Sequence, residues 1–319
     1  MRPLGAIEII PMPYVTESSK INMVVIFTSD YNFRDIHGFF QSFVQFILDI
    51  KEIGEKVNLF VIYAKSVDSS TGQAIFLKED KSNCAFINKT LKELSKKYSS
   101  LIKTSSRMVF SELNITQHLY NSESYRLLTV VDYISKKLTA DSLILVVSPC
   151  AEMQAEFLNR VRLNTVQGHQ VFFPIPFSEY TPNIVYPSRP FPDEIEINKN
   201  YGYFNFHSYA FASFYNSDFS RVKLMHLDEQ TKSNRNIKET SFLSNDLYSI
   251  FSLEKKINLL RATDQALKCK WHLNENCIKG QTEHDEIERC LKQREAGLGT
   301  KAQLAMHLMK HYDTLIRNN

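Results

Sequence analysis

The sequence predicts an α/β protein built on a central sheet whose inner strands are parallel. Short apolar runs of strand length alternate with amphipathic segments of helical period through the first 150 residues. This alternation favours βαβ units, because parallel neighbours need a crossover that is usually a helix. A chain of 319 residues can bury a large core, and its 22 Phe and 15 Tyr predict an aromatic-rich interior.

The first half of the chain supplies these elements in a regular order. Residues 21–27 (INMVVIF) read as the first strand, and residues 33–54 as a helix, since their apolar residues recur every three or four positions. The next expected elements are a strand at 57–64, a helix at 88–98, a short strand at 108–113, a helix at 125–138 and a strand at 143–147.

The second half is less regular. After a break at 148–150 the chain is expected to resume as a helix at 155–165, followed by an extended segment at 169–177. The prolines of 180–200 predict a loop, and the aromatic run 201–219 either fills a core or lines a pocket. From residue 252 the chain reads as mostly helical. The expected organisation is an irregular lead-in at 1–20, a domain at 21–251 and a helical C-terminal part of the same domain at 252–319.

Composition excludes several classes of protein. The net charge is +3 and no block of Lys and Arg stands out, so no nucleic-acid partner is expected. No apolar run has the length of a membrane span, and the N-terminus does not read as a signal peptide. Yet Asn88 and Asn114 begin acceptor sequences for N-glycosylation. Cys277 and Cys290 could close a short disulfide loop or remain free thiols; the spacing does not decide.

The end of the strand at 143–147 is the candidate site. Ligands of α/β sheets usually bind at the carboxyl ends of central strands. Here that strand is followed by Ser148, Pro149 and Cys150. Serine and cysteine are poor ligands for Mg²⁺ or Mn²⁺, which prefer carboxylate oxygen. No Cys-His pattern marks Cys150 as a nucleophile, so a buried thiol is expected there.

Several stretches, in the right order, resemble the C-terminal glycosyltransferase domain of the chondroitin synthase and chondroitin N-acetylgalactosaminyltransferase family. They are YVTESSKINMVVIF (14–27), EFLNRVRLNTVQGHQVFFPIPFSEYTP (156–182), YNSDF (215–219), KWHLNENC (270–277) and RCLKQREAGLGTKAQLAMHLMKH (289–311). The resemblance implies a GT-A type nucleotide-sugar fold with a helical C-terminal extension. It also implies a role in making chondroitin within the Golgi lumen, as part of a type II protein of the Golgi cisterna membrane.

The same resemblance shows where this chain departs from the family pattern. Family enzymes end the strand with Asp-x-Asp, which holds a metal under the UDP diphosphate; Ser148 and Cys150 occupy those positions. The acidic pair that supplies the general base is replaced by Leu243 and Ser244. Leucine accepts no proton, and serine is too weak a base on its own. The resemblance therefore predicts a degenerate metal site and a degenerate catalytic site.

Three residues could still contribute to a nucleotide or metal site. Arg126 matches a family arginine that could meet the nucleotide, or it is a solvated helix charge. His272 matches the histidine that completes the metal shell, or it is simply packed and hydrogen-bonded. Glu152 could join His272 in an altered metal site, or it could favour the dipole at the start of a helix.

These features lead to three functional hypotheses. The first is a polymerizing-factor-like subunit without its own catalysis or cofactor, which forms a hetero-oligomer with an active chondroitin synthase. The second is an active hexosyltransferase that moves GalNAc or GlcUA from a UDP-sugar to the growing chain, with Mn²⁺ as its cofactor. The third is a non-catalytic module that binds the chondroitin chain.

Overall fold

The computed structural model describes residues 20–28, 31, 33–52, 56–67, 80–101, 107–116, 123–179, 202–206, 208–223 and 247–269. Several predictions lie outside these ranges. They are the lead-in before residue 20, the loop at 180–200, the C-terminal helix beyond residue 269, and the residues Leu243, Ser244, His272, Cys277 and Cys290.

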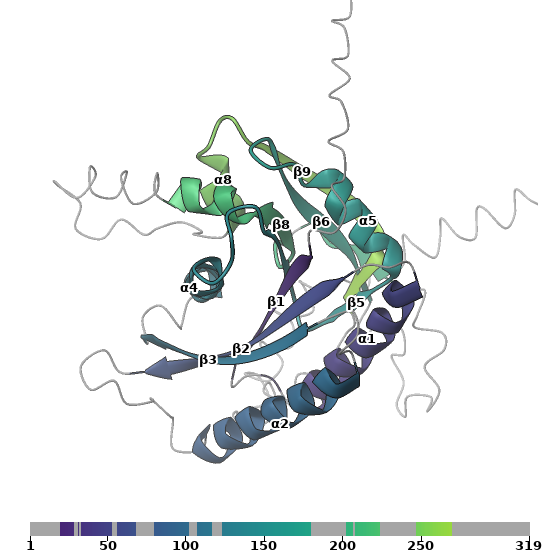
Figure 1. The fold of residues 1–319 in the computed structure, drawn as a ribbon, viewed down its shortest axis with the longest axis vertical. Coiled ribbons are helices and arrows are strands. Elements are labelled where there is room, and N and C mark those ends of the chain that lie inside the picture. The colour runs from purple at the N-terminus through teal and green to yellow at the C-terminus, as the bar shows by residue number, and fades with distance from the viewer. Residues whose placement is uncertain are drawn as a thin grey trace, which may run out of the picture.

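The described elements follow the predicted alternation closely (Figure 1). They are β1 (Ile21–Phe27), α1 (Phe33–Glu52), β2 (Val57–Val67), α2 (Asp80–Leu101), β3 (Arg107–Thr116), α4 (Glu123–Ser135), β4 (Leu143–Val147), β5 (Ala151–Met153), α5 (Ala155–Asn164), β6 (Gln170–Glu179), β7 (Gly202–Phe204), β8 (Ala212–Tyr215), α8 (Leu247–Ser252) and β9 (Asn258–Cys269).

Nine strands of the described chain form one mixed sheet in the order β3-β2-β1-β4-β8-β6-β9-β5, with β7 paired to β6 beside this path. β3, β2, β1 and β4 are parallel neighbours, as are β6 and β9. The pairs β4–β8, β6–β8, β6–β7 and β5–β9 are antiparallel and shorter. Most paired residues therefore lie in parallel ladders, which confirms the predicted α/β class with a mixed, mostly parallel sheet.

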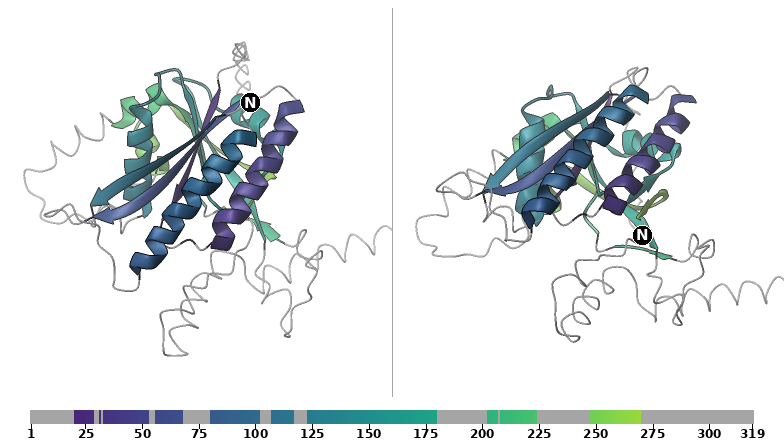
Figure 2. Two further views of the ribbon diagram at one scale, coloured as in Figure 1. Left: turned by 60° about the horizontal axis from the view of Figure 1, so that its bottom comes forward. Right: turned by 90° about the horizontal axis from the view of Figure 1, so that it is seen from below.

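Helices cover both faces of this sheet, as Figures 1 and 2 show. α1, α2 and α5 pack on one face over a core that includes Phe39, Phe40 and Phe157. α4 and α8 pack on the other face over a second core. Because β1 and β4 contribute to both cores, every one of their residues but Ile26 is buried, and apart from Asn22 all of them are apolar.

One buried polar contact fixes the register of the three inner strands. Asn22 of β1 is 4% exposed, and its amide donates to the carbonyl of Leu143 on β4 at 3.2 Å. Its amide oxygen accepts a hydrogen bond of 2.9 Å from Asn58 of β2. A register slip would leave these buried groups without partners, so the pair favours a single alignment.

Two segments differ from the sequence prediction. Residues 258–269 were expected to be helical and instead form β9, which pairs in parallel with β6 and, at its end, antiparallel with β5. Residues 151–153 were expected to lead directly into a helix and instead form β5, so that α5 begins only at Ala155. In both cases long-range strand pairing decides the structure, because the local pattern fits either state.

The aromatic run 201–219 contributes mainly to the core. Phe211, Phe214 and Phe219 are at most 2% exposed, whereas Phe206 is 60% exposed at the surface. No helix in the described ranges is both long enough and apolar enough for a membrane crossing.

Candidate functional site

The sheet has a topological switch point between β1 and β4. From β1 the chain adds β2 and then β3 on one side, and it then returns through α4 to place β4 on the other side of β1. In open α/β sheets the crevice outside the carboxyl ends of the strands at such a point is the usual ligand site. The expected site at the end of 143–147 therefore has the topology of a binding site.

A small pocket lies at this point, with a volume of about 70 Å³. Its walls come from the ends of β1 and β4, the first turns of α4 and the loop before β8. The lining residues are Ile26, Thr28, Tyr31, Arg126, Leu127, Val146, Val147, Ser148, Pro149 and Ala210. Sites for whole small-molecule ligands are typically about 300–1,000 Å³, so the described residues enclose only part of such a volume.

Arg126 is the one Lys or Arg side chain among the described residues that line this pocket. It lies near the start of α4 and is half-buried, so it is not a fully solvated helix charge. A cation at the carboxyl end of parallel strands can attract an anionic ligand such as a phosphate. The structure thus places Arg126 where the resemblance expects a nucleotide contact, and that role stays a prediction.

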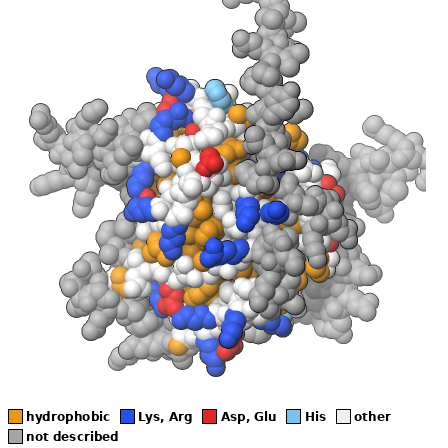
Figure 3. All heavy atoms as spheres, in the orientation of Figure 1, with side chains coloured by type: hydrophobic (Ala, Val, Ile, Leu, Met, Phe, Trp, Pro, Cys, Tyr) orange, Lys and Arg blue, Asp and Glu red, His pale blue; other side chains and the backbone are white. Residues whose placement is uncertain are grey.

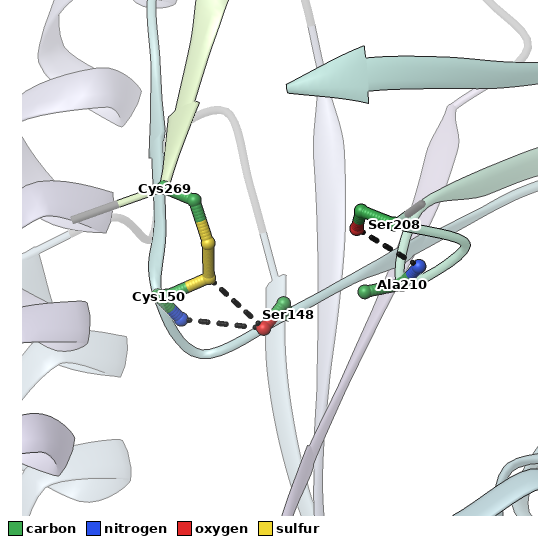
Figure 4. The surroundings of a disulfide bond; sticks show 5 residues. All are labelled: Ser148, Cys150, Ser208, Ala210 and Cys269. Atoms are coloured by element: carbon green, nitrogen blue, oxygen red, sulfur yellow. Dashed lines mark hydrogen bonds between the residues drawn. A yellow bond between two sulfur atoms is a disulfide. The ribbon is translucent and has the colours of Figure 1, made fainter. Parts of the chain in front are cut away.

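Cys150 is not the free buried thiol that the sequence suggested. It is half-buried and forms a disulfide with Cys269 at the end of β9 (Figure 4). The antiparallel ladder between β5 and β9 pairs Ala151 with Cys269, which brings the two Cα atoms to 4.9 Å. That separation lies within the range that a disulfide spans. The bond is invisible to local sequence reasoning, because its two cysteines are 119 residues apart.

Ser148 turns toward this disulfide. Its hydroxyl oxygen accepts a weak hydrogen bond from the Cys150 backbone N–H at 3.5 Å and lies 3.2 Å from Cys150 Sγ (Figure 4). Because a disulfide sulfur carries no hydrogen, only the hydroxyl can donate in that second contact. The side chain that replaces the first family aspartate is therefore engaged in fixing the turn after β4.

The residues at the end of β4 do not fit a hard divalent cation. Ser148 offers a neutral hydroxyl, and Cys150 has no thiolate to offer because its sulfur is bonded to Cys269. Mg²⁺ and Mn²⁺ prefer anionic oxygen ligands. Within the described ranges, no three His, Cys, Asp or Glu side chains come together in a way that could hold a metal.

Glu152 does not begin a helix, contrary to the sequence-based reading of a dipole contact. It lies in β5 opposite Lys268 of β9, and α5 starts three residues later with Glu156 as the acidic residue of its first turn. Glu152 is half-buried and next to the disulfide-bonded end of the ladder. Its suggested partner His272 lies outside the described residues.

One structural ion pair was missed by sequence reasoning. Asp264 of β9 is 1% exposed, and its two carboxylate oxygens accept hydrogen bonds from Arg160 of α5 at 2.5 and 2.7 Å. The hydrogen bond that Arg160 donates to Asp264 raises the pKa of the guanidinium and outweighs burial, which lowers it. Asp264 stands at the irregularity in the β6–β9 register, just before the residues of β9 that also pair with β5, so the ion pair fixes α5 over this bulge.

A second missed feature explains part of the YNSDF stretch. Asp218 is 3% exposed, and its carboxylate accepts hydrogen bonds from the Gly168 N–H at 3.0 and 3.1 Å. Gly168 has φ of 76°, a conformation that favours glycine, in the turn that precedes β6. Burial raises the pKa of the Asp218 carboxyl, although the bond from Gly168 lowers it in part.

The neighbouring Asn216 has a similar structural role. Its amide donates to the carbonyls of Ser135, Leu138 and Thr139 at 3.0 to 3.1 Å, which ties the end of β8 to the turn that follows α4. Asn216 and Asp218 are thus used for packing and turn formation. The sequence resemblance singles out the YNSDF stretch, and the structure shows that Asn216 and Asp218 do not line the pocket at the end of β4.

Charged side chains of both signs lie on the face of the molecule that Figure 3 shows. On the face shown in Figure 3, Lys and Arg side chains are scattered among hydrophobic and acidic ones and do not form a continuous stripe. This agrees with the mild net charge of +3.

A mixed, mostly parallel sheet with helices on both faces and a pocket at its switch point defines an α/β protein of the open-sheet class. The chain belongs to the chondroitin N-acetylgalactosaminyltransferase family, whose pattern it matches over residues 1–304.

The relatives of this chain are considerably longer than it is. It is 28% identical over 313 residues to human chondroitin sulfate synthase 2, covering 97% of this chain and 36% of that protein. It is 24% identical over 326 residues to human chondroitin sulfate glucuronyltransferase, covering 97% of this chain and 38% of that protein. The chain therefore spans little more than a third of each relative.

Among solved structures, the apo form of the glycosyltransferase GlyE from Streptococcus pneumoniae TIGR4 is similar with a TM-score of 0.37 and 10% identity. The match covers 76% of this chain and 45% of that one. This remote likeness adds nothing to the family assignment, which depends on the sequence match.

Proposed function

We propose that this domain takes part in chondroitin biosynthesis as a non-catalytic, polymerizing-factor-like subunit that supports an active synthase of the same family. One observation carries the proposal: the position expected for a metal-binding aspartate is Cys150, and its sulfur is bonded to Cys269. A diphosphate without a metal lacks both charge neutralisation and stabilisation of the leaving group.

The rest of the fold supports a retained binding role. The two cores, the register contact of Asn22 and the Arg160–Asp264 pair all maintain the family fold, although the end of β4 has lost its carboxylates. Selection for partner binding would preserve the fold even where the residues at the end of β4 have changed. The partner is an active chondroitin synthase, and the growing chondroitin chain is the shared substrate.

The disulfide also supports a secretory setting. Disulfides persist in oxidising compartments and are rare in the cytosol. A Golgi-lumen location, as part of a membrane-anchored protein, agrees with Cys150–Cys269 and with the two glycosylation sequences.

A nucleotide-binding titration tests the proposal. The purified chain is mixed with UDP-GlcUA or UDP-GalNAc, with and without Mn²⁺, and its thermal unfolding is followed; an active family transferase serves as the positive control. Ligand at 100 times its Kd would stabilise a competent site by about 2.7 kcal/mol. We expect no shift and co-purification with an active synthase. Stabilisation that requires Mn²⁺ would show that the metal site works and would overturn the proposal.

A second candidate, favoured by the position of Arg126, is a metal-independent transferase in which this side chain neutralises the diphosphate. It predicts that UDP-sugars stabilise the chain without Mn²⁺, that Arg126→Ala removes the effect, and that the exposed Arg107→Ala does not. If only chondroitin oligosaccharides stabilise the chain, the domain is instead a module that binds the polymer.

A further inference from the structure

The two N-glycosylation sequences of the chain occupy different environments on neighbouring elements. Asn88 lies in α2 and Asn114 lies in β3, and α2 packs against β3. Both sequences satisfy the acceptor pattern, so the sequence alone treats them as equal. The structure distinguishes them, because a glycan is bulky and hydrated and must project from the surface of the folded protein into solvent.

Asn88 faces the interface between the helix and the sheet. Its side-chain amide donates a hydrogen bond to the carboxylate of Glu112 on β3, and its amide oxygen is buried with no hydrogen-bond partner in the described structure. Nδ2 is the only donor of an asparagine side chain and also the atom that carries a glycan. The contact with Glu112 therefore directs the acceptor atom into the packed interface.

The surroundings of Asn88 leave little freedom for a different arrangement. Glu112 also accepts hydrogen bonds from Lys65 and from Lys92, whose Nζ is 2.5 Å away. Thr90, the third residue of the acceptor sequence, is 7% exposed. Asn88 is half-buried, and a bulky glycan on its Nδ2 would crowd the Asn88–Glu112 contact between α2 and β3.

Asn114 has the opposite environment. Its side chain is exposed, and it stands between Leu113 and Ile115, which contribute to the core on the far side of the strand. Side chains alternate between the two faces of a strand, so Asn114 points away from the buried Ile115. Among the described strands, β3 is the last of the sheet order and pairs only with β2.

We infer that Asn114 is the N-glycosylation site of this protein and that Asn88 remains unmodified in the folded chain. The reaction joins Asn114 Nδ2 to the anomeric carbon of the first sugar of a lipid-linked oligosaccharide. The bond from that carbon to the lipid diphosphate breaks, the diphosphate leaves with the electron pair, and Nδ2 loses one proton.

Secretion from eukaryotic cells tests this inference. The full chain is directed into the endoplasmic reticulum by an added signal peptide, and the secreted protein is compared before and after treatment with peptide N-glycosidase. Release of the glycan in ¹⁸O-water converts the modified Asn to labelled Asp, which peptide mass spectrometry locates without any mutation. We expect label at Asn114 and none at Asn88. Label at Asn88, or secreted protein unmodified at Asn114, would overturn the inference.

Matched variants give an independent readout. Asn114→Gln and Thr116→Ala should each abolish the mobility shift caused by the glycosidase, whereas Asn88→Gln should leave it unchanged. A shift that survives in both Asn114→Gln and Thr116→Ala contradicts the assignment. The inference rests on the secretory setting proposed above, but the added signal peptide imposes that setting. A failure at Asn114 would therefore count against this site and would leave the proposed function untouched.

Discussion

Asp264 shows how one buried carboxylate can organise the junction of several elements. Both of its oxygens bind Arg160, and one of them also accepts the N–H of Ala266 at 2.9 Å. Removal of one partner from a buried ion pair leaves the other without compensation. The Arg160 side chain is 38% exposed, so in a variant without the Asp264 carboxylate, water could replace part of its hydrogen bonding.

Asp264→Ala is therefore expected to lower the free energy of unfolding by about 3 kcal/mol. Asp264→Asn should cost less, because its amide oxygen can still accept from Ala266. Urea denaturation measures both. The exposed Asp49→Ala is the matched control and should stay within about 0.5 kcal/mol of the parent. An equally small effect of Asp264→Ala would show that the pair is not a stabilising contact.

Glu112 is the residue whose charge should couple stability to pH. Burial raises the pKa of its carboxyl, but hydrogen bonds from Lys65, Lys92 and Asn88 outweigh burial and lower the pKa from 4.5 to about 2. A carboxyl with a lowered pKa in the folded state stabilises the fold above its unfolded pKa and loses that contribution as pH falls. The window for Glu112 is thus about pH 4.5 down to about pH 2.

Glu112→Gln should lower the free energy of unfolding by about 1–2 kcal/mol at pH 7, since its partners are partly exposed. The difference from the parent protein should shrink as the pH falls from 4.5 toward 2. Denaturation curves across this range provide the measurement. Glu93→Gln, in an exposed pair with Lys89, is the control and should change little at any pH. A difference independent of pH would argue against a charge effect.

At the scale of elements, the strongest local patterns were the most predictive. The strands at 21–27 and 143–147 match β1 and β4 at both ends, because strands buried on both faces are almost entirely apolar, with Asn22 the one polar residue of the two. β5 has only three residues and β9 mixes polar and apolar positions without a clear period. Their pairing with each other and with β6 decides their state, and such pairing leaves no local signal.

The disulfide should stabilise the β5–β9 ladder strongly, because it closes a loop of 119 residues. In the chain-entropy account a loop of this length is worth up to about 5 kcal/mol. We expect the double variant Cys150→Ser/Cys269→Ser to lose about 3–5 kcal/mol in urea denaturation. Reductant should destabilise the parent protein more than the double variant, and the difference should be of similar size. A parent protein insensitive to reductant would contradict the assigned bond.

At the scale of the whole molecule, the sheet order predicts a gradient of local stability. β1 and β4 lie inside the sheet with core on both faces, whereas no other described strand pairs with the outer edge of β3. Amide hydrogens of β1 and β4 should exchange only through global unfolding, and those on the outer edge of β3 much faster. Hydrogen exchange read by mass spectrometry tests this. If the amide hydrogens of β3 exchanged as slowly as those of β1, another segment would have to pair with the outer edge of β3.

The sequence was enough to choose the end of β4 as the candidate site, but it predicted only some of the side-chain contacts there. A strand rich in apolar residues followed by a break marked the end of β4, and the topology made it a switch point. The residue types at Ser148 and Cys150 predicted a degenerate metal site, and that stays a prediction. The bond to Cys269 could not be predicted, because it depends on a ladder between segments that are distant in the chain.

The link between Cys150 and Cys269 has a consequence for the integrity of the chain. A protease that cuts once anywhere between these two residues would leave two pieces that stay covalently attached. Such a nicked molecule would migrate intact in a gel without reducing agent and split into two bands with it.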